Sequence, residues 1–210
     1  MKNQDSGSFS IRGRFKVDES SYGLVVEGQY DVGVFTEFIR RIVSPNVKVI
    51  PRPCGGVAQL KKNSPALLRD LEHVRQGRPV DKVLVVRDWR GPDLNSGEEQ
   101  LRERVAGKHF QFPRGIQFCC VRQEMEAWLL ADENAINSVA RDRGGRNVSR
   151  VQGEIEKIGN PKQMFLGLLS RAGLPYTPEV CRQIAGRCDL SLLKQRCPSF
   201  RSFEQKVIDC

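Results

Sequence analysis

Short apolar runs alternate with amphipathic segments through the first half of the chain. Four runs predict buried strands: residues 22–28 (YGLVVEG), 46–50 (NVKVI), 81–88 (DKVLVVRD) and 116–121 (IQFCCV). Two prolines, Pro51 and Pro53, are expected to end the second strand. Residues 31–43, 58–76 and 98–107 carry apolar side chains at helical spacing, and Pro65 is expected to interrupt or start the second of these helices. This alternation predicts an α/β fold with a mostly parallel sheet and helices on both faces.

The pattern becomes helical after Arg122. Four segments have helical period: residues 124–141, 160–173, 178–189 and 200–209. The glycine- and arginine-rich residues 141–150 (RDRGGRNVSR) are expected to form a mobile loop. We therefore divide the chain into an N-terminal extension (1–20), an α/β domain (21–132) and a helical C-terminal part packed on that domain (133–210).

The amino-acid composition indicates the cellular location to expect and the kinds of site to disfavour. The 210 residues are 39% hydrophobic and 28% charged, as in ordinary soluble proteins, and no apolar run is long enough for a membrane span. The N-terminus lacks the apolar stretch of a signal peptide, and the seven cysteines contain no CxxC pair. We expect a cytoplasmic protein with reduced thiols and no membrane association. Two histidines, His73 and His109, are too few to favour a histidine-rich zinc site or a serine-type triad.

A formal net charge of +9 favours a polyanionic partner such as DNA or RNA. The same excess also suits a solvated basic surface with no partner, and the sequence leaves both interpretations open.

Acidic residues gather where the predicted strands end. In a parallel sheet ligands bind at the carboxyl ends of the strands. Six acids follow three of these ends: Glu27 and Asp31 after the first strand, Asp88 and Asp93 after the third, and Glu124 and Glu126 after the fourth. Such oxygen-rich groups suit Mg²⁺ or Mn²⁺, and Gly28 is expected to allow the sharp turn that keeps Glu27 at the sheet edge. Each acid also has a simpler structural alternative: Asp31 suits a helix cap, and Glu126 suits a helix surface or an ion pair. Asp88 is harder to explain in this way, because an acid directly after VLVV is poorly placed unless it is paired or ligated.

Several motifs together resemble one family. The segments VVEGQYD, VLVVRD and RQEMEAWLLAD, followed by NPKQMF and RCPSFRSFEQKV, resemble a family of TOPRIM-like proteins related to the OLD nucleases. The resemblance covers nearly the whole chain, and EMEAWLLAD is its most specific element.

The resemblance implies a TOPRIM core in which a glutamate after the first strand and a DxD after the third bind divalent metal for phosphodiester chemistry. Glu27 matches the glutamate, Asp31 an acid that often follows it, and Asp88 the first aspartate of the DxD. Arg90 stands where the second aspartate would be, so that either Asp93 compensates from the loop or one metal position is lost. The resemblance also implies a bacterial cytoplasmic setting in anti-phage defence, commonly beside an ATPase partner of the SMC or ABC type.

Three functions compete. The first is a Mg²⁺- or Mn²⁺-dependent nuclease in which Glu124 or Glu126 completes the site, and arginines beside the acids bind the scissile phosphate or pair with the acids: Arg87, Arg90 and Arg122. The second is a nucleic-acid-binding or partner-binding subunit that kept the fold and lost turnover, with Arg90 replacing the metal. The third, a phosphotransfer or nucleotide-binding enzyme, ranks last because the chain contains no GxxxxGK[ST].

Overall fold

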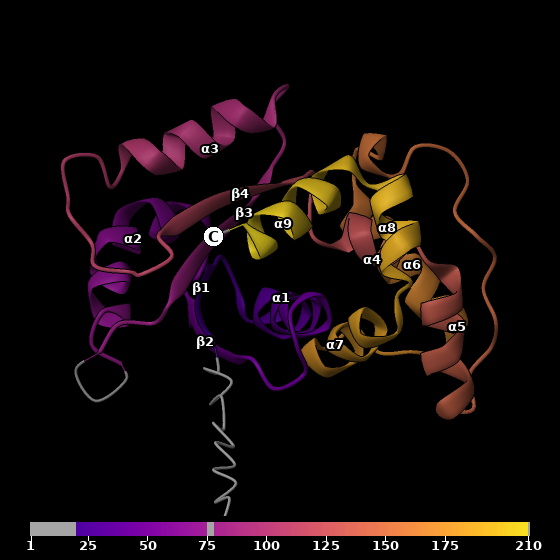
Figure 1. Ribbon diagram of the computed structural model, residues 1–210. Coiled ribbons are helices and arrows are strands. Elements are labelled where there is room, and N and C mark those ends of the chain that lie inside the picture. Colours follow the sequence, from indigo (N-terminus) through magenta and orange to yellow (C-terminus); the bar gives the residue numbers. More distant parts are fainter. Residues whose placement is uncertain (1–19, 75–77, 210) are drawn as a thin grey trace, which may run out of the picture.

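Four parallel strands form the centre of the molecule. The computed structural model describes residues 20–74 and 78–209 (Figure 1), so the N-terminal extension lies outside the described residues except for Ser20. The strands are β1 (Ser21–Val26), β2 (Lys48–Pro53), β3 (Lys82–Trp89) and β4 (Ile116–Arg122). Their order is β2-β1-β3-β4 and every pairing is parallel, which confirms the predicted fold class.

Helices cover both faces of the sheet, because each central strand is apolar on both sides. In β3, Leu84 and Val86 belong to a core that includes α1 (Gln29–Ile42) and α9 (Pro198–Ile208). Val83 and Val85 point the other way, into a smaller core with α2 (Val57–Leu71) and α3 (Leu94–Glu103). Figure 1 shows α2 and α3 on one side of the sheet and α1 and α9 on the other. The run VLVV is uninterrupted because both of its faces are buried.

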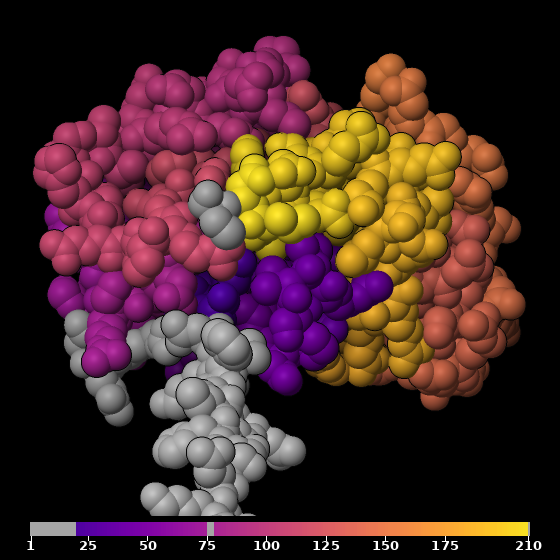
Figure 2. Space-filling model, in the orientation of Figure 1, coloured from indigo at the N-terminus to yellow at the C-terminus, as the bar shows by residue number. Residues whose placement is uncertain are grey.

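The C-terminal helices share the larger core with the sheet. They are α4 (Glu126–Leu130), α5 (Glu133–Asp142), a 3₁₀ turn η1 (Ile155–Lys157), α6 (Pro161–Ala172), α7 (Pro178–Arg187), α8 (Leu190–Arg196) and α9. In the space-filling view, α9 (yellow) lies directly against α1 (purple), so the two ends of the described chain pack together (Figure 2). The division at residue 132 stays a prediction.

Trp128 is the centre of that core. It is fully buried, its indole nitrogen donates to Ser199 Oγ at 2.9 Å, and four phenylalanines surround its rings at 5.0–6.0 Å: Phe35, Phe38, Phe200 and Phe203. Leu129 and Leu130 are also fully buried. Three consecutive residues of the EMEAWLLAD segment therefore belong to the core.

The expected effect of the prolines was wrong. Strand β2 continues through Pro51 and Pro53, which pair in register with Leu24 and Val26. β2 is an edge strand that pairs only with β1 in the described sheet. Its even-numbered positions direct their backbone N–H groups toward β1, as in the hydrogen bond of 2.9 Å from Cys54 N to Val26 O. Both prolines occupy odd positions, where a backbone N–H would face away from the sheet and is not needed. Helix α2 likewise runs through Pro65 and ends at Leu71, earlier than expected.

The predicted helix over residues 124–141 is two helices. Asp132 separates α4 from α5 and caps α5 by accepting from Asn134 N at 3.0 Å, and its other oxygen accepts from Asp189 N at 2.7 Å. The loop expected to be mobile begins inside α5, and the Asn137 side chain then holds Val148 through two hydrogen bonds of 2.7 and 3.0 Å. Sequence periodicity did not predict α8 or η1.

Within the described residues, no helix has both the length and the apolar content that crossing a membrane requires. The six cysteines of this part of the chain are free thiols.

Candidate functional site

Glu27 and Asp88 meet at the carboxyl ends of β1 and β3. These strands are direct parallel neighbours, and the backbone N–H of Asp88 donates to Glu27 Oε1 at 3.1 Å. Asp31, in the first turn of α1, accepts a hydrogen bond from Gly28 N at 2.8 Å and so caps the helix. Gly28 has φ −142° and ψ 176°, which any residue adopts, so the expectation that a sharp turn requires this glycine was wrong.

The junction of β4 and α4 brings two more acids to the same place. Gln123 has a left-handed φ of 65°, a conformation that non-glycine residues rarely adopt, and its N–H donates to Trp89 O at 2.9 Å. The turn that it makes directs Glu124 and Glu126 toward the strand edge, and Met125 N donates to Asp88 Oδ1 at 3.1 Å. We refer to the five carboxylates together as the acidic cluster: Glu27, Asp31, Asp88, Glu124 and Glu126.

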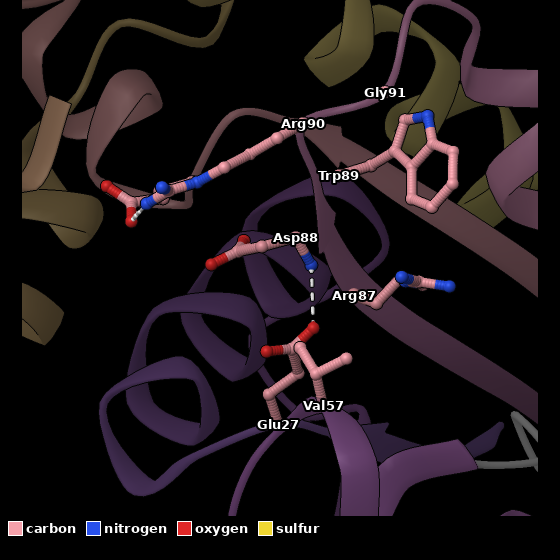
Figure 3. A pocket seen from close by; sticks show the side chains of 8 residues that line it. Glu27, Val57, Arg87, Asp88, Trp89, Arg90 and Gly91 are labelled. Carbon is pink, nitrogen blue, oxygen red and sulfur yellow. Dashed lines mark hydrogen bonds and ion pairs between the residues drawn. The ribbon is translucent and has the colours of Figure 1, made fainter. Parts of the chain in front are cut away.

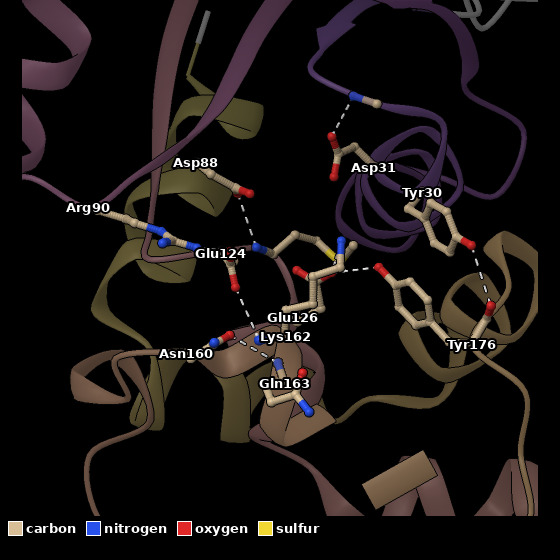
Figure 4. A network of polar contacts seen from close by, with 12 residues as sticks. Tyr30, Asp31, Asp88, Arg90, Glu124, Glu126, Asn160, Lys162, Gln163 and Tyr176 are labelled. Carbon is tan, nitrogen blue, oxygen red and sulfur yellow. Dashed lines mark hydrogen bonds and ion pairs between the residues drawn. The ribbon is translucent and has the colours of Figure 1, made fainter. Parts of the chain in front are cut away.

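Two of these five acids have positively charged partners. Glu124 contacts the Arg90 guanidinium and accepts from Lys162 N at 3.1 Å. Glu126, 5% exposed, accepts from the Tyr176 hydroxyl at 2.6 Å and lies 3.6 Å from Lys162 Nζ. Figure 4 shows these contacts converging from β3, α4 and α6.

Two cavities meet at Glu27, Asp88 and Glu124. The arginine cavity, of about 420 Å³, is also lined by Val57 and by residues 87 and 89–91 (Figure 3). The tyrosine cavity, of about 230 Å³, is lined by the whole acidic cluster with Lys162, Gly28, Gly55, Gly56 and a pair of stacked tyrosines, Tyr30 and Tyr176. The tyrosine rings lie 4.4 Å apart, and Lys162 Nζ sits 5.3 Å from the centre of the Tyr176 ring. A ligand at the strand edge would therefore contact carboxylates between a cationic side and an aromatic side.

The carboxylates without cationic partners hold protons unusually tightly. The pKa of Glu27 is raised to about 7, chiefly by burial and also by the neighbouring Asp31, against the lowering effects of the hydrogen bond from Asp88 N and of Arg87. The pKa of Asp31 is raised to about 6, again chiefly by burial and also by Glu126, against the hydrogen bond from Gly28 N and the charge of Lys162. The pKa of Asp88 lies well above its usual range because of burial and repulsion by the other acids of the cluster. The surroundings of these three acids thus favour their neutral form, because they offer too little positive charge to offset burial and mutual repulsion.

The carboxylates of the acidic cluster are the right ligand type for a hard divalent cation, but they do not form a complete coordination sphere. All five groups are carboxylates, the ligands that Mg²⁺ and Mn²⁺ prefer. Across residues 20–74 and 78–209, no three His, Cys, Asp or Glu side chains converge closely enough to hold a metal ion as they stand. A cation here would be held by one or two carboxylates and keep water as its other ligands, which is common for Mg²⁺.

The other acids and arginines named from the sequence have separate positions. Asp93 caps α3, where it accepts from Asn95 N at 3.2 Å and from Ser96 N and Oγ at 3.0 Å, and it lines neither cavity. Arg90 contacts Glu124 and does not lie between Glu27 and Asp88. Arg122 donates to the carbonyl oxygens of Gly91 and Pro92.

Sequence reasoning missed the basic and aromatic side of the site. Lys162 lies in the segment NPKQMF, which the sequence marked only as part of a resemblance, and Tyr176 lies in an unassigned connection. Nothing in the periodicity of either segment indicates a position at the strand edge. The helix-start pattern of an asparagine before proline was the available signal, because Asn160 caps α6 and so fixes Lys162 in its first turn.

Comparison with known proteins identifies a family but no activity. The model of a family described as "Domain of unknown function (DUF4276)" matches residues 26–208. No curated protein matches the chain. A solved structure, the C-terminal region of the Burkholderia pseudomallei OLD protein, is similar with a TM-score of 0.46 and 11% identity, over 89% of this chain and 96% of that one.

Proposed function

The chain belongs to the DUF4276 family, and we propose that its acidic cluster is the active site of a metal-dependent phosphodiesterase that cleaves nucleic acid. The observation that carries this proposal is the contact between Glu27 and Asp88 at the ends of adjacent strands, among acids whose pKa values are raised. Buried carboxylates without counter-charges destabilise the fold, and proteins keep such arrangements chiefly where they serve a function. A bound cation would supply the missing positive charge.

Within the cluster, the acids divide by their partners. Among the described residues, Glu27, Asp31 and Asp88 contact no side-chain cation. One or two of these three would hold Mg²⁺ or Mn²⁺ with water as its other ligands, and the cation would polarise a phosphoryl oxygen and lower the pKa of a water. Glu126 is buried and hydrogen-bonded to Tyr176, so it is fixed in orientation and suited to position a water. Glu124 anchors Arg90 and the first turn of α6 at the mouth of the site.

The partner is a polyanion by charge. Thirty-four Lys and Arg against 25 Asp and Glu give the chain its excess of +9, although the site itself is acidic. Positive charge around an acidic, metal-binding centre is the distribution that holds a phosphate backbone while leaving the cluster free for a cation. The implied setting in anti-phage defence beside an SMC- or ABC-type ATPase stays a prediction of the resemblance.

Calorimetric titration with Mn²⁺ tests the proposal, together with cleavage of mixed-sequence DNA and RNA. We expect the parent to bind Mn²⁺ and to cleave, and Glu27→Gln and Asp88→Asn to lose both, because each removes a charged oxygen donor. Glu99→Gln is the matched control: Glu99 lies in α3 with 66% of its side chain exposed and lines neither cavity. Absence of Mn²⁺ binding by the parent, with and without an oligonucleotide, would rule out this function.

A second function is favoured by Arg90. An arginine at the place of the second aspartate of a DxD, together with the open arrangement of the carboxylates, fits a nucleic-acid-binding or partner-binding subunit that has lost turnover. This protein would bind an oligonucleotide without Mn²⁺ and show no cleavage at any Mn²⁺ concentration. The same titration and cleavage assay therefore distinguishes the two functions.

A further inference from the structure

Arg87 is a buried cation, and two of its three guanidinium nitrogens lack a hydrogen-bond partner. Only 5% of the residue is exposed, and within residues 20–74 and 78–209 nothing accepts a hydrogen bond from its buried Nε and Nη1 atoms. The contact recorded for its guanidinium is with the ring of Trp89, whose centre lies 4.6 Å away. A buried charged donor left unpaired is unfavourable, and such groups usually have a partner in the functional state.

The neighbouring acids do not meet this need. Glu27 accepts from Asp88 N at 3.1 Å, and among the described residues no hydrogen bond joins it to the buried Nε and Nη1 atoms of Arg87. Glu98 is occupied, because it contacts Lys206 and accepts from Cys120 N at 3.4 Å. Asp88 is the next residue along β3 and points to the opposite face of the sheet. Figure 3 shows the Arg87 side chain directed away from the Asp88 carboxylate, beside Trp89.

Arg87 also differs from the other two arginines near the cluster. Arg90 is 62% exposed and contacts Glu124, while Arg122 donates to two loop carbonyls. Both are therefore engaged within the protein. Arg87 lines the arginine cavity, which opens onto Glu27, Asp88 and Glu124.

We propose that Arg87, stacked on Trp89, binds a phosphate group of the nucleic-acid strand, adjacent to the bond at the acidic cluster. A guanidinium matches a phosphate because its parallel N–H donors reach two oxygens, and the indole ring holds the guanidinium plane in place. Since Arg87 and Asp88 lie on opposite faces of β3, this phosphate is a neighbour of the scissile one. Naming a nucleic-acid strand rests on the proposed function, whereas anion binding itself requires neither metal nor turnover.

The two tryptophans give a direct readout in the unmodified protein. Trp89 contacts Arg87, and Trp128 is fully buried in the other core, so an ¹H–¹⁵N spectrum should show two indole signals that Trp89→Phe assigns. With EDTA present, inorganic phosphate should shift the Trp89 signal saturably and leave that of Trp128 in place, while chloride at equal ionic strength should shift neither. A Trp89 signal that does not respond to phosphate overturns the proposal, whether or not any Arg87 variant folds.

Variants then identify the residue and the source of the phosphate. Arg87→Met keeps side-chain length without charge, and Arg87→Lys keeps charge without the fork. Both should weaken binding in EDTA by about tenfold or more, for inorganic phosphate as followed by the Trp89 indole signal and for a short single-stranded oligonucleotide as followed by anisotropy. The control is Arg102→Gln, because Arg102 also lies over a ring (Phe118, 5.3 Å) but lines neither cavity, and its affinities should stay within about twofold of the parent.

The outcomes separate this proposal from the proposed function. If Arg87 variants lose phosphate but keep full oligonucleotide affinity, the site takes a free phosphate and the assignment to a strand is wrong. If they bind phosphate as the parent does, Arg87 is not the receptor. A parent that binds phosphate through Arg87 but never binds Mn²⁺ keeps the anion site and rules out the metal-dependent nuclease.

Discussion

Replacing Glu27 by glutamine should stabilise the metal-free protein at alkaline pH. Burial raises the pKa of Glu27 from an ordinary 4.5 to about 7, so ionising it in the folded state is unfavourable. The folded state therefore holds more protons than the unfolded state between these two values, and stability falls as the pH rises through them. Glutamine removes the charge but keeps a carbonyl oxygen that can accept from Asp88 N, which now donates to Glu27 at 3.1 Å.

The size of the effect follows from the same two values. A difference between 4.5 and about 7 corresponds to about 3 kcal/mol at pH 8, where the carboxylate is ionised in both states. Water entering the two cavities lowers this, so we expect a gain of about 1–3 kcal/mol, or roughly 2–10 °C in Tm for a chain of this size. The gain should shrink toward zero as the pH falls to about 4.5, because Glu27 is then protonated in the folded state.

Urea unfolding in EDTA at pH 5 and pH 8 measures this directly for the parent, Glu27→Gln and the exposed control Glu99→Gln. At pH 8, Mn²⁺ should make the parent more stable than Glu27→Gln. A ligand of the folded state stabilises it by about 2.7 kcal/mol at one hundred times its Kd, and the glutamine variant lacks the charged oxygen that would bind the ion. A Glu27→Gln protein that is less stable than the parent at pH 8 in EDTA would show that Glu27 is not a strained carboxylate, and the electrostatic basis of the site would be wrong.

Three further outcomes are expected. Affinity for a mixed-sequence oligonucleotide, measured by anisotropy, should fall steeply between low and moderate salt and vary little with base sequence; no binding at low salt would leave the +9 charge as surface only. Arg90→Ala should lower Mn²⁺-dependent cleavage only modestly, whereas Asp88→Asn should abolish it, and equal losses would contradict the assignment of Arg90 to the mouth of the site. Trp128→Ala should lower the free energy of unfolding by about 3–5 kcal/mol in urea, since the side chain is fully buried among four phenylalanines, and a loss below about 1 kcal/mol would contradict its central place in the core.

The strand-end acids were predictable because strand ends are a local property. Glu27 and Asp88 each follow an apolar run, and a parallel sheet brings such ends to one edge. Asp93 illustrates the limit: as an acid in a loop it suggested a ligand, but it precedes a helix and its oxygens satisfy the first N–H groups of α3. Whether such an acid caps a helix or binds a ligand depends on where the next helix begins. The apolar pattern predicted a helix start at residue 98, whereas α3 begins at Leu94, directly after Asp93.

Other features depend on relations across the chain that no local pattern contains. Pro51 and Pro53 are compatible with β2 only because β2 lies at the edge of the sheet. The sequence of a single strand does not reveal its position in the sheet. Lys162 and Tyr176 reach Glu126 from α6 and the connection after it, contacts separated by 36 and 50 residues. Their positions follow from how the C-terminal helices pack on Trp128, and therefore from the folded core.

The partners of the five acids favour a site for one cation. Arg90 directly follows the end of β3, two residues after Asp88, and its guanidinium contacts Glu124, while Lys162 lies beside Glu126. Two acids of the cluster are thus balanced by side chains, which leaves Glu27, Asp31 and Asp88, whose pKa values are raised. One divalent cation would offset two of those three negative charges, and a second cation would compete with Arg90 for Glu124. On the proposed function, Arg90 would therefore remove one metal position without occupying the other, and for this reason Arg90→Ala and Asp88→Asn should differ in their effect on cleavage.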